Sequence, residues 1–88
     1  MQGENVIILD VRTPEETAQG KIDEAVEINW FDATSAAQIK ALDKDKTYLV
    51  YCKSGGRSGK CVRMMSDAGF ENLYNLDGGY QAWAKAKQ

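Results

Sequence analysis

One segment of the chain combines residue types that could do chemistry: Cys52-Lys53-Ser54-Gly55-Gly56-Arg57-Ser58. Two adjacent glycines allow backbone angles with positive φ, so that successive N–H groups can converge on one point. A helix that begins at Ser58 would add partial positive charge there, and Lys53 and Arg57 bring two cations. An anion is favoured in such a loop. If the anion is the Cys52 thiolate, its pKa falls below the ordinary value of about 8.5, and the segment therefore predicts a nucleophilic cysteine.

The chain contains no histidine, which narrows how a cysteine could be activated. A Ser-His-Asp triad, a Cys-His dyad and a histidine-ligated metal site are all excluded. The two cysteines, Cys52 and Cys61, lack the C-x-x-C spacing of a structural zinc site. They are also too few for the disulfide framework of a small secreted domain. We therefore expect no metal and no organic cofactor, and activation of Cys52 by backbone groups.

Two other interpretations of this segment are weaker. The first is a strand-to-helix turn in which the cysteine is incidental, since Cys is often simply buried. The second is a nucleotide-binding loop, because Gly59-Lys60 follows the segment; however, Ser54 stands where the Walker pattern needs glycine, and Cys61 where it needs Ser or Thr. The ordered coincidence of cysteine, glycine pair, arginine and serine favours the nucleophile.

Composition sets limits on function. The 88 residues predict one domain over 1–88, with ordinary apolar (43%) and charged (27%) fractions. A net charge of −2 argues against nucleic-acid binding. The longest apolar run, Tyr48 to Cys52, is too short to cross a membrane. No signal peptide is recognisable, but an export segment could have been removed, so both periplasm and cytoplasm remain open. We expect a monomer.

Short apolar runs alternate with amphipathic stretches along the chain. The predicted strands are Val6–Leu9, which ends at Asp10, then Ala25–Ile28, Thr47–Tyr51 and Asn72–Leu76. The predicted helices run from Thr13-Pro14 to Gly20, from Asp32 or Thr34 to Leu42, from Ser58 to about Ala68, and onward from Gly78-Gly79. This alternation predicts an α/β fold: a small parallel β-sheet flanked by helices on both faces. Functional groups then gather at the carboxyl ends of the strands, where Asp10 and Cys52 lie.

The sequence resembles the single-domain rhodaneses, a family of sulfurtransferases, and is similar to their compact phage-shock type. The segments that carry the resemblance are Leu9–Glu16, Gly20–Ile22, Cys52–Ser58, Ala68–Phe70, and Leu76–Gly79 with Trp83. The resemblance implies a rhodanese-like fold and a Cys52 persulfide. That persulfide is cradled by the amides of residues 53 to 57. The implied donor is thiosulfate or another persulfide, and the implied acceptor is cyanide or a thiol. Substrate-binding residues are then Lys53, Ser54, Gly55, Gly56, Arg57 and Ser58.

The length of the loop separates two chemistries. Rhodanese-type loops place the arginine five residues after the cysteine, as Arg57 stands to Cys52. The similar loops of phosphatases and arsenate reductases have one residue more, which widens the cradle enough for a tetrahedral oxyanion. The spacing therefore favours sulfur transfer over phosphate or arsenate chemistry. A regulatory or sulfur-carrier module with the same fold and little turnover remains a second interpretation.

Other conspicuous residues have structural interpretations. Cys61, a possible resolving thiol, falls with Met64, Met65 and Ala68 on one helical stripe, which favours core packing. Asp10 is expected to accept backbone or arginine hydrogen bonds beneath the loop rather than to bind substrate.

Three aromatic residues and one charged run complete the predictions. Tyr80 and Trp83, one turn apart, are expected to pin the last helix to the sheet. Trp30-Phe31 follows a predicted strand and is left open as a lining of the site. Asp43–Lys46 is expected to be a solvated turn.

Overall fold

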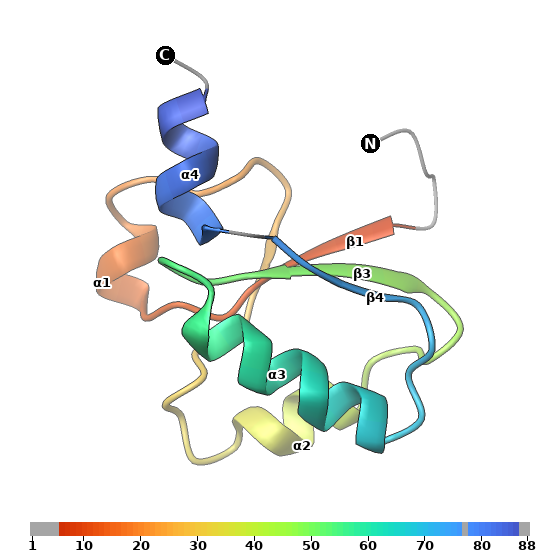
Figure 1. The fold of residues 1–88 in the computed structure, drawn as a ribbon. Helices are drawn as coiled ribbons and strands as arrows, with labels where there is room; N and C mark the ends of the chain where they lie inside the picture. The colour runs from red at the N-terminus through yellow and green to blue at the C-terminus, as the bar shows by residue number, and fades with distance from the viewer. Residues whose placement is uncertain (1–5, 77, 87–88) are drawn as a thin grey trace.

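The computed structural model describes residues 6–76 and 78–86. Strands and helices alternate strictly along the chain, as the sequence predicts (Figure 1). The elements are β1 (Val6–Asp10), α1 (Pro14–Thr17), β2 (Val26–Glu27), α2 (Ser35–Lys40), β3 (Thr47–Tyr51), α3 (Gly56–Asp67), β4 (Leu73–Asn75) and α4 (Gly79–Ala86). No helix in the described ranges is long and apolar enough to cross a membrane.

The four strands form one parallel sheet in the order β2-β1-β3-β4. The register between the two central strands pairs Leu9 with Val50 and Asp10 with Tyr51. Because every strand runs the same way, all carboxyl ends meet at one edge of the sheet. Cys52 directly follows β3 at this edge, and the loop after it reaches α3.

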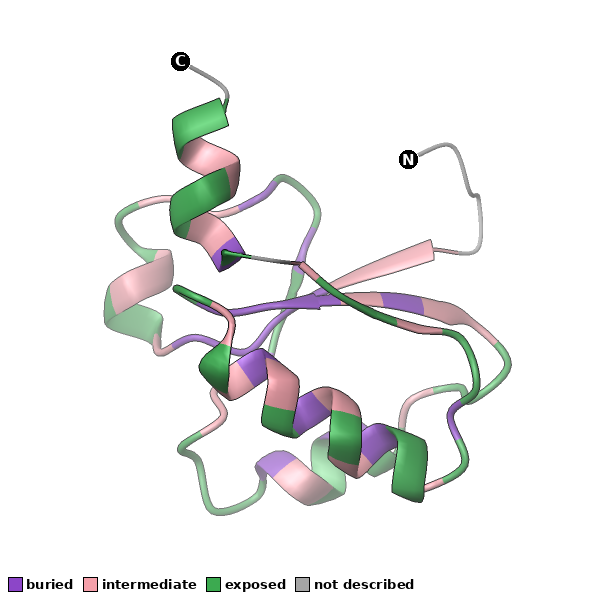
Figure 2. Cartoon of the chain, viewed as in Figure 1, coloured by how far each residue is buried: buried purple, intermediate pink, exposed green. Residues whose placement is uncertain are grey.

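Helices α2 and α3 cover one face of the sheet, below it in Figure 1. Alternate residues of the central strands point into this layer, as the two-residue period of a strand requires. Its buried side chains are Leu9, Val11, Ile28, Ile39, Tyr48, Val50, Cys52, Cys61, Met65 and Phe70. They appear purple along the sheet and on the inner sides of the helices (Figure 2). The expected core stripe of α3 is confirmed, because Cys61 and Met65 are fully buried, while Met64 and Ala68 pack against this layer.

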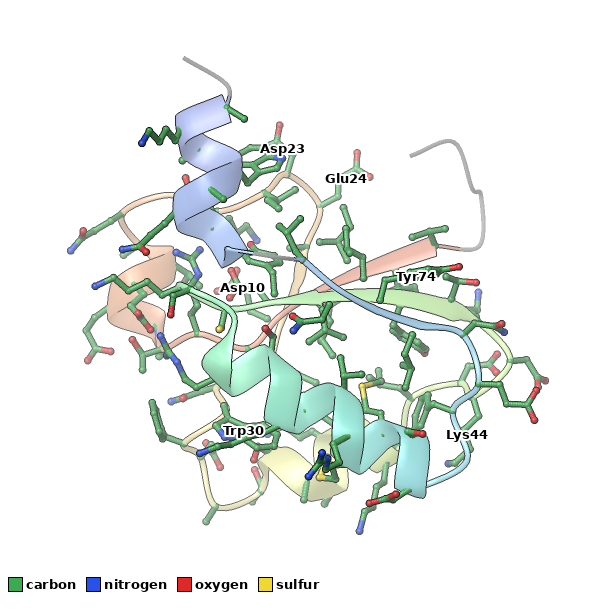
Figure 3. All side chains as sticks on the ribbon, viewed as in Figure 1. Asp10, Asp23, Glu24, Trp30, Lys44 and Tyr74 are labelled. Atoms are coloured by element: carbon green, nitrogen blue, oxygen red, sulfur yellow. The ribbon has the colours of Figure 1, made fainter. Side chains whose placement is uncertain are left out.

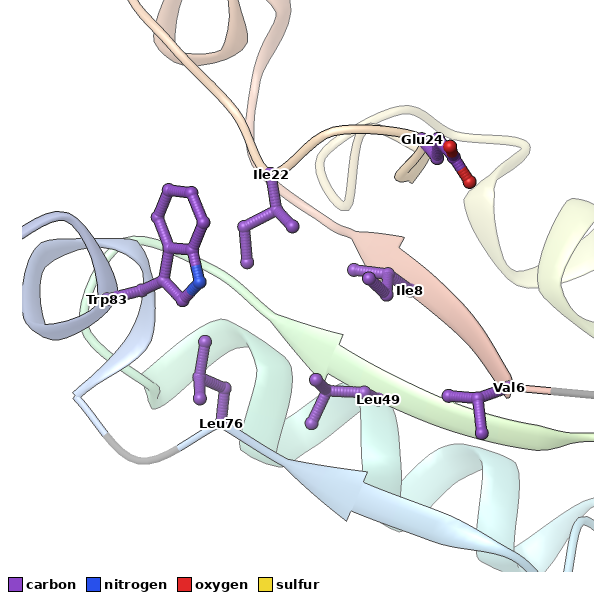
Figure 4. Close-up of a pocket in the computed structure, with 7 residues that line it drawn as sticks. All are labelled: Val6, Ile8, Ile22, Glu24, Leu49, Leu76 and Trp83. Carbon is purple, nitrogen blue, oxygen red and sulfur yellow. The ribbon is translucent and has the colours of Figure 1, made fainter. Parts of the chain in front are cut away.

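Helix α4 covers the other face, so the expectation of helices on both faces is confirmed. Tyr80 and Trp83 pack against Tyr51 and Ile22, which confirms that they pin this helix to the sheet. An apolar pocket of about 460 Å³ lies beside them (Figure 4). Its lining residues are Val6, Ile8, Ile22, Glu24, Leu49, Leu76 and Trp83.

Helix α3 begins at Gly56 rather than at Ser58, so the predicted start was wrong by two residues. The physical reason is Gly55, whose φ of 114° lets the chain turn into the helix early. No side chain caps this helix start. Ser58 is therefore an internal residue of the first turn, and its hydroxyl is available for another partner.

The remaining boundaries differ by a few residues. The edge strands β2 and β4 are shorter than predicted, because each has a hydrogen-bonded neighbour on one side only. Helix α1 ends at Thr17 instead of continuing to Gly20. Of the two predicted starts for α2, the structure selects Thr34 as N-cap. Asp43–Lys46 is the expected polar turn, and Asp77, part of the segment Leu76–Gly79, lies outside the described residues.

Candidate active site

Cys52 lies at the carboxyl end of β3, just beneath the surface, with 1% of its area exposed. Its Sγ accepts a hydrogen bond from the Gly55 amide at 3.1 Å. The Ser58 hydroxyl lies 3.5 Å from the same sulfur. The loop and the first turn of α3 thus surround the sulfur with donors, as the glycine pair and helix start predict.

Helix α4 holds the first peptides of the active-site loop in place. Its first turn binds the loop carbonyls on the opposite side: the Tyr80 amide donates to the Cys52 carbonyl at 2.7 Å and the Gln81 amide to the Lys53 carbonyl at 3.1 Å. A peptide group points its N–H away from its C=O, so a fixed Lys53 carbonyl turns the Ser54 amide of the same peptide away from α4, and this amide is one of those that lower the Cys52 pKa. The close approach requires Gly79, whose φ is 61°. A Cβ there would lie 2.5 Å and 2.6 Å from the two carbonyl oxygens.

Burial raises the pKa of the Cys52 thiol, but hydrogen bonds to the sulfur outweigh it. The Ser58 hydroxyl contributes most to lowering the pKa, followed by the amides of Ser58, Gly55 and Ser54. The net pKa is lowered, which is the direction expected from the sequence. The donors differ slightly from the expected set, because the Ser58 amide, beyond residues 53 to 57, takes part. Cys52 can therefore ionise without a histidine.

Asn75 is a site residue that sequence analysis missed. Its Oδ1 lies 2.6 Å from the Ser58 hydroxyl oxygen, which is also 3.2 Å from the Gly55 carbonyl. The hydroxyl has one proton to donate and can accept from an amide N–H₂. Asn75 thereby influences whether Ser58 donates to Cys52. The available signal was its position near the carboxyl end of a predicted strand, at the edge that carries Cys52.

Arg57 does not present a free positive charge, because Glu16 holds its guanidinium. Nη1 donates to Oε1 of Glu16 at 2.6 Å and Nη2 to Oε2 at 2.8 Å. This ion pair holds the pKa of Glu16 at about 2. In the sequence, Glu16 belonged only to the segment Leu9–Glu16 that carries the resemblance, since a contact between residues so far apart leaves no local pattern. The guanidinium also lies 5.5 Å from the ring centre of Phe31.

The aromatic pair left open by the sequence divides between two environments. Phe31, beside Arg57, is 67% exposed, whereas Trp30 packs partly buried against the layer under α2 and α3. Only Phe31 therefore lies against a residue of the candidate site.

Lys53 and Ser54 are exposed at the surface of the loop. Lys53 takes part in none of the ion pairs found within residues 6–76 and 78–86. It lines a cavity of about 310 Å³ between the loop, α1 and α4. The other lining residues are Arg12, Glu16, Gln19, Tyr80 and Gln81.

Asp10 has the expected structural role under the loop. Its carboxylate accepts hydrogen bonds from the Arg12 amide and side chain and, at 2.6 Å, from the Tyr51 hydroxyl. Asp10, the last residue of β1 (labelled in Figure 3), is fully buried, and Arg12 is 4% exposed. Both charges are thus compensated within the protein. The guanidinium also stacks on Tyr80, at 4.3 Å from the ring centre.

Cys61 is chemically unlike Cys52. It is fully buried, and burial raises the pKa of its thiol to about 12. Its sulfur contacts the Met65 sulfur at 3.8 Å. No group of three or more potential metal ligands occurs among the residues that the structure describes.

A family model described as "Rhodanese-like domain" matches residues 1–86 of the chain. A sulfurtransferase of Allochromatium vinosum is 34% identical over 82 residues, which are 93% of this chain and 75% of that protein. The thiosulfate sulfurtransferase GlpE of Shewanella oneidensis is 32% identical over 97% of this chain and 82% of its own. The crystal structure of a rhodanese-related protein from Thermoplasma volcanium superimposes with a TM-score of 0.84 at 32% identity, over 94% of this chain and 80% of that one.

Proposed function

This chain belongs to the family of rhodanese-like domains, and we propose that it is a sulfurtransferase that carries sulfane sulfur as a persulfide on Cys52. The observation that carries the proposal is the surroundings of Sγ: a hydrogen bond from the Gly55 amide, the Ser58 hydroxyl, and a lowered thiol pKa. Such a pocket stabilises negative charge on a sulfur atom. The same donors can stabilise the negative charge of a persulfide formed on this sulfur.

The first half of the reaction loads the cysteine. The Cys52 thiolate attacks the outer sulfur of thiosulfate; an Sγ–S bond forms, the S–S bond of thiosulfate breaks, and sulfite departs with the electron pair. With an organic persulfide as donor, the same attack releases a thiolate. Either donor leaves Cys52 as a persulfide, and no external oxidant or reductant is needed.

The second half unloads it. An acceptor attacks the outer sulfur of the Cys52 persulfide, the bond to Sγ breaks, and Sγ departs as the thiolate. Cyanide would leave as thiocyanate and a thiol as a new persulfide. The stabilised thiolate is a good leaving group for the same reason that it is a good nucleophile: the amides that hold its charge are in place at both stages.

We assign donor binding to the loop residues Lys53, Ser54, Gly55, Gly56, Arg57 and Ser58. Lys53 is the exposed cation at the rim, and it can attract anionic donors. The amides of Ser54, Gly55 and Ser58 can hold the transferred sulfur. Arg57 contributes through its pair with Glu16.

Mass spectrometry of the intact protein tests this function. After incubation with thiosulfate or cysteine persulfide, we expect the mass to rise by one sulfur atom, and to return on addition of cyanide. The adduct should be absent in Cys52→Ser and retained in Cys61→Ala, because Cys61 is buried with a raised thiol pKa.

Two outcomes would contradict the proposal. Loss of the adduct in Cys61→Ala, with the adduct retained in Cys52→Ser, would show that Cys61 and not Cys52 carries the sulfur. A Cys52 adduct that forms but is never released to cyanide or thiols would indicate a sulfur-carrier module instead of a transferase.

A further inference from the structure

We infer that Glu16 selects the sulfur donor. Because it holds the Arg57 guanidinium, the protein reacts less readily with thiosulfate than with a persulfide on an amino-acid or short-peptide carrier. This inference rests on the proposed function and names the donor class that the function leaves open. Glu16 acts through Arg57 and is thus a positioning residue.

The pair between these residues is fixed from both sides. Both oxygens of Glu16 bind Arg57. Oε1 also accepts from the Thr13 amide at 2.9 Å and from the Thr13 hydroxyl at 3.1 Å. These contacts belong to the capping box of α1, so the start of this helix holds the Glu16 carboxylate in place independently of Arg57. The Arg57 side chain is 20% exposed and the Glu16 side chain 27% exposed.

The pair changes the charge that a donor meets at the loop. Arg57 lies in the first turn of α3, five residues after Cys52. Glu16 contributes most to raising the pKa of its guanidinium, and the charge of the Cys52 thiolate adds to the rise. Attack on thiosulfate concentrates two negative charges on the departing sulfite, next to the loop. A guanidinium already neutralised by a carboxylate stabilises these charges less than a free one would.

The reaction with an organic persulfide needs less charge stabilisation from Arg57. Its departing thiolate carries one negative charge, and any further charges lie on the carrier, away from the reacting sulfur. The Glu16 carboxylate therefore penalises thiosulfate more strongly than the persulfide. Discrimination between donors requires only this difference.

The cavity beside the loop offers room for such a carrier. It has a volume of about 310 Å³ and is bordered by Lys53 of the loop. Gln19 and Gln81 contribute amide groups to its lining. Lys53 can bind a carboxylate, and the glutamine amides can donate to and accept from a peptide-like group. These are the functional groups of an amino-acid or short-peptide thiol, and thiosulfate would use little of this space.

The substitution Glu16→Gln separates charge from structure. Glutamine is equally suited to the third helical position of a capping box, so the start of α1 is retained while the charge on Arg57 is released. Glu15→Gln is the matched control. It removes an equal charge one residue away, from an exposed side chain in the same helical turn.

The first measurement does not depend on sulfur transfer. Cys52 is alkylated with anionic iodoacetate and with neutral iodoacetamide, and the modified peptide is quantified by mass spectrometry. We expect Glu16→Gln to raise the ratio of the two rates by a factor of about five to ten, since a free guanidinium attracts the anionic reagent. Glu15→Gln should leave the ratio within about twofold of the unsubstituted protein. Equal ratios in Glu16→Gln and Glu15→Gln would overturn the inference.

The second measurement compares kcat/KM for thiosulfate and for cysteine persulfide. The unsubstituted protein should prefer the persulfide, and Glu16→Gln should raise the value for thiosulfate on the order of tenfold with a much smaller change for the persulfide. A common change for both donors, or an initial preference for thiosulfate, would refute the role of Glu16. If neither donor loads Cys52 in any variant, the proposed function itself fails, whereas the alkylation ratio still decides whether Glu16 controls anion access.

Discussion

At the scale of single residues, the reactivity of Cys52 depends on how one hydroxyl proton is shared. The Ser58 hydroxyl is near the Cys52 sulfur, the Gly55 carbonyl and Asn75 Oδ1, and it is the largest contributor to lowering the thiol pKa. A hydroxyl donates one hydrogen bond at a time. The Ser58 hydroxyl can therefore donate its proton either to the Cys52 thiolate or to Asn75 Oδ1, and only the first of these hydrogen bonds favours ionisation of Cys52.

Replacing Ser58 with alanine should raise the pKa of Cys52. The thiolate loses a donor, whereas burial, which favours the neutral thiol, remains. We expect the midpoint of the pH–rate profile for iodoacetamide alkylation to move upward by about one pH unit. Below that midpoint the rate at a fixed pH then falls.

Ser54→Ala is the control for this measurement. Ser54 lowers the thiol pKa through its backbone amide, and alanine keeps this amide. The Ser54 side chain is exposed, so its replacement should not disturb the packing. The midpoint of the pH–rate profile of Ser54→Ala should equal that of the unsubstituted protein. A Ser58→Ala profile identical to that of Ser54→Ala would show that the hydroxyl is not a donor to the sulfur.

The sequence predicted the nucleophile but not all of its partners. Cys52, Gly55 and Ser58 are close together in the chain, so their spacing alone indicates a loop around the sulfur. Glu16 and Asn75 reach the site through the pairing of strands and the placement of α1. Such long-range contacts depend on the assembled sheet, and a single sequence contains no local pattern that specifies them.

At the scale of elements, α4 acts on the active-site loop through backbone contacts. Its first two amides after Gly79 bind the Cys52 and Lys53 carbonyls, and a residue with a Cβ at Gly79 would collide with both oxygens. The positive φ of Gly79 adds a second reason for glycine. The helix thereby fixes the two peptides that follow Cys52 and Lys53.

Gly79→Ala should consequently impair both stability and reactivity. The clash displaces the start of α4 from the loop, which we expect to cost roughly 2–3 kcal/mol in free energy of unfolding. It should also raise the Cys52 pKa toward its ordinary value, because the loop amides lose their orientation. Urea denaturation and the pH–rate profile of alkylation measure the two effects.

Gly59→Ala provides the comparison. Gly59 lies inside α3, where an added Cβ would meet the Asn75 amide nitrogen at an ordinary contact distance of 3.6 Å. Alanine at a helical position is neutral or stabilising by up to about 1 kcal/mol. If Gly79→Ala were as well tolerated as Gly59→Ala, the proposed control of the loop by α4 would be wrong.

The order of elements followed from the sequence, whereas several of their ends did not. Apolar runs such as Thr47–Tyr51 match the observed strand because this strand is central and paired on both sides. The start of α3 was missed because Gly55, not a side-chain cap, begins the helix. Glycine suits turns and helix starts equally, so its presence could not identify the first helical residue.

At the scale of the whole molecule, Tyr51 joins distant parts of the chain. Its ring is fully buried in the layer under α4. Its hydroxyl donates to the Asp10 carboxylate at 2.6 Å and accepts from the Ile22 amide at 3.1 Å. One atom thus connects two strands of the sheet with the segment before β2.

Tyr51→Phe should reduce the free energy of unfolding by about 2–3 kcal/mol, because the Ile22 amide and the Asp10 carboxylate both lose a buried partner. Tyr48→Phe is a matched control: its hydroxyl makes one hydrogen bond, to the carbonyl of Asp43 in an exposed turn, and its loss should cost about 1 kcal/mol. Urea denaturation compares them. Equal losses would contradict the bridging role of Tyr51.

The placement of helices on both faces of the sheet could be predicted because the alternation of strands and helices allows few other topologies. The sequence also indicated that Asp10 is structural and that Tyr80 and Trp83 face the sheet, and both expectations hold. It could not indicate that Tyr51 would bridge Asp10 and Ile22. That bridge requires the register of β1 against β3, which is fixed only when the sheet forms.

The dependence of the loop on α4 has a consequence during protein synthesis. The ribosome adds Cys52 well before Tyr80 and Gln81, whose amides bind the loop carbonyls. A nascent chain that has not reached these residues lacks both hydrogen bonds to the loop, and we expect its cysteine to ionise less readily than in the folded protein. Thiolates are oxidised far more readily than thiols. Because the loop is completed late, we expect Cys52 to be less prone to oxidation in the growing polypeptide than in the folded protein.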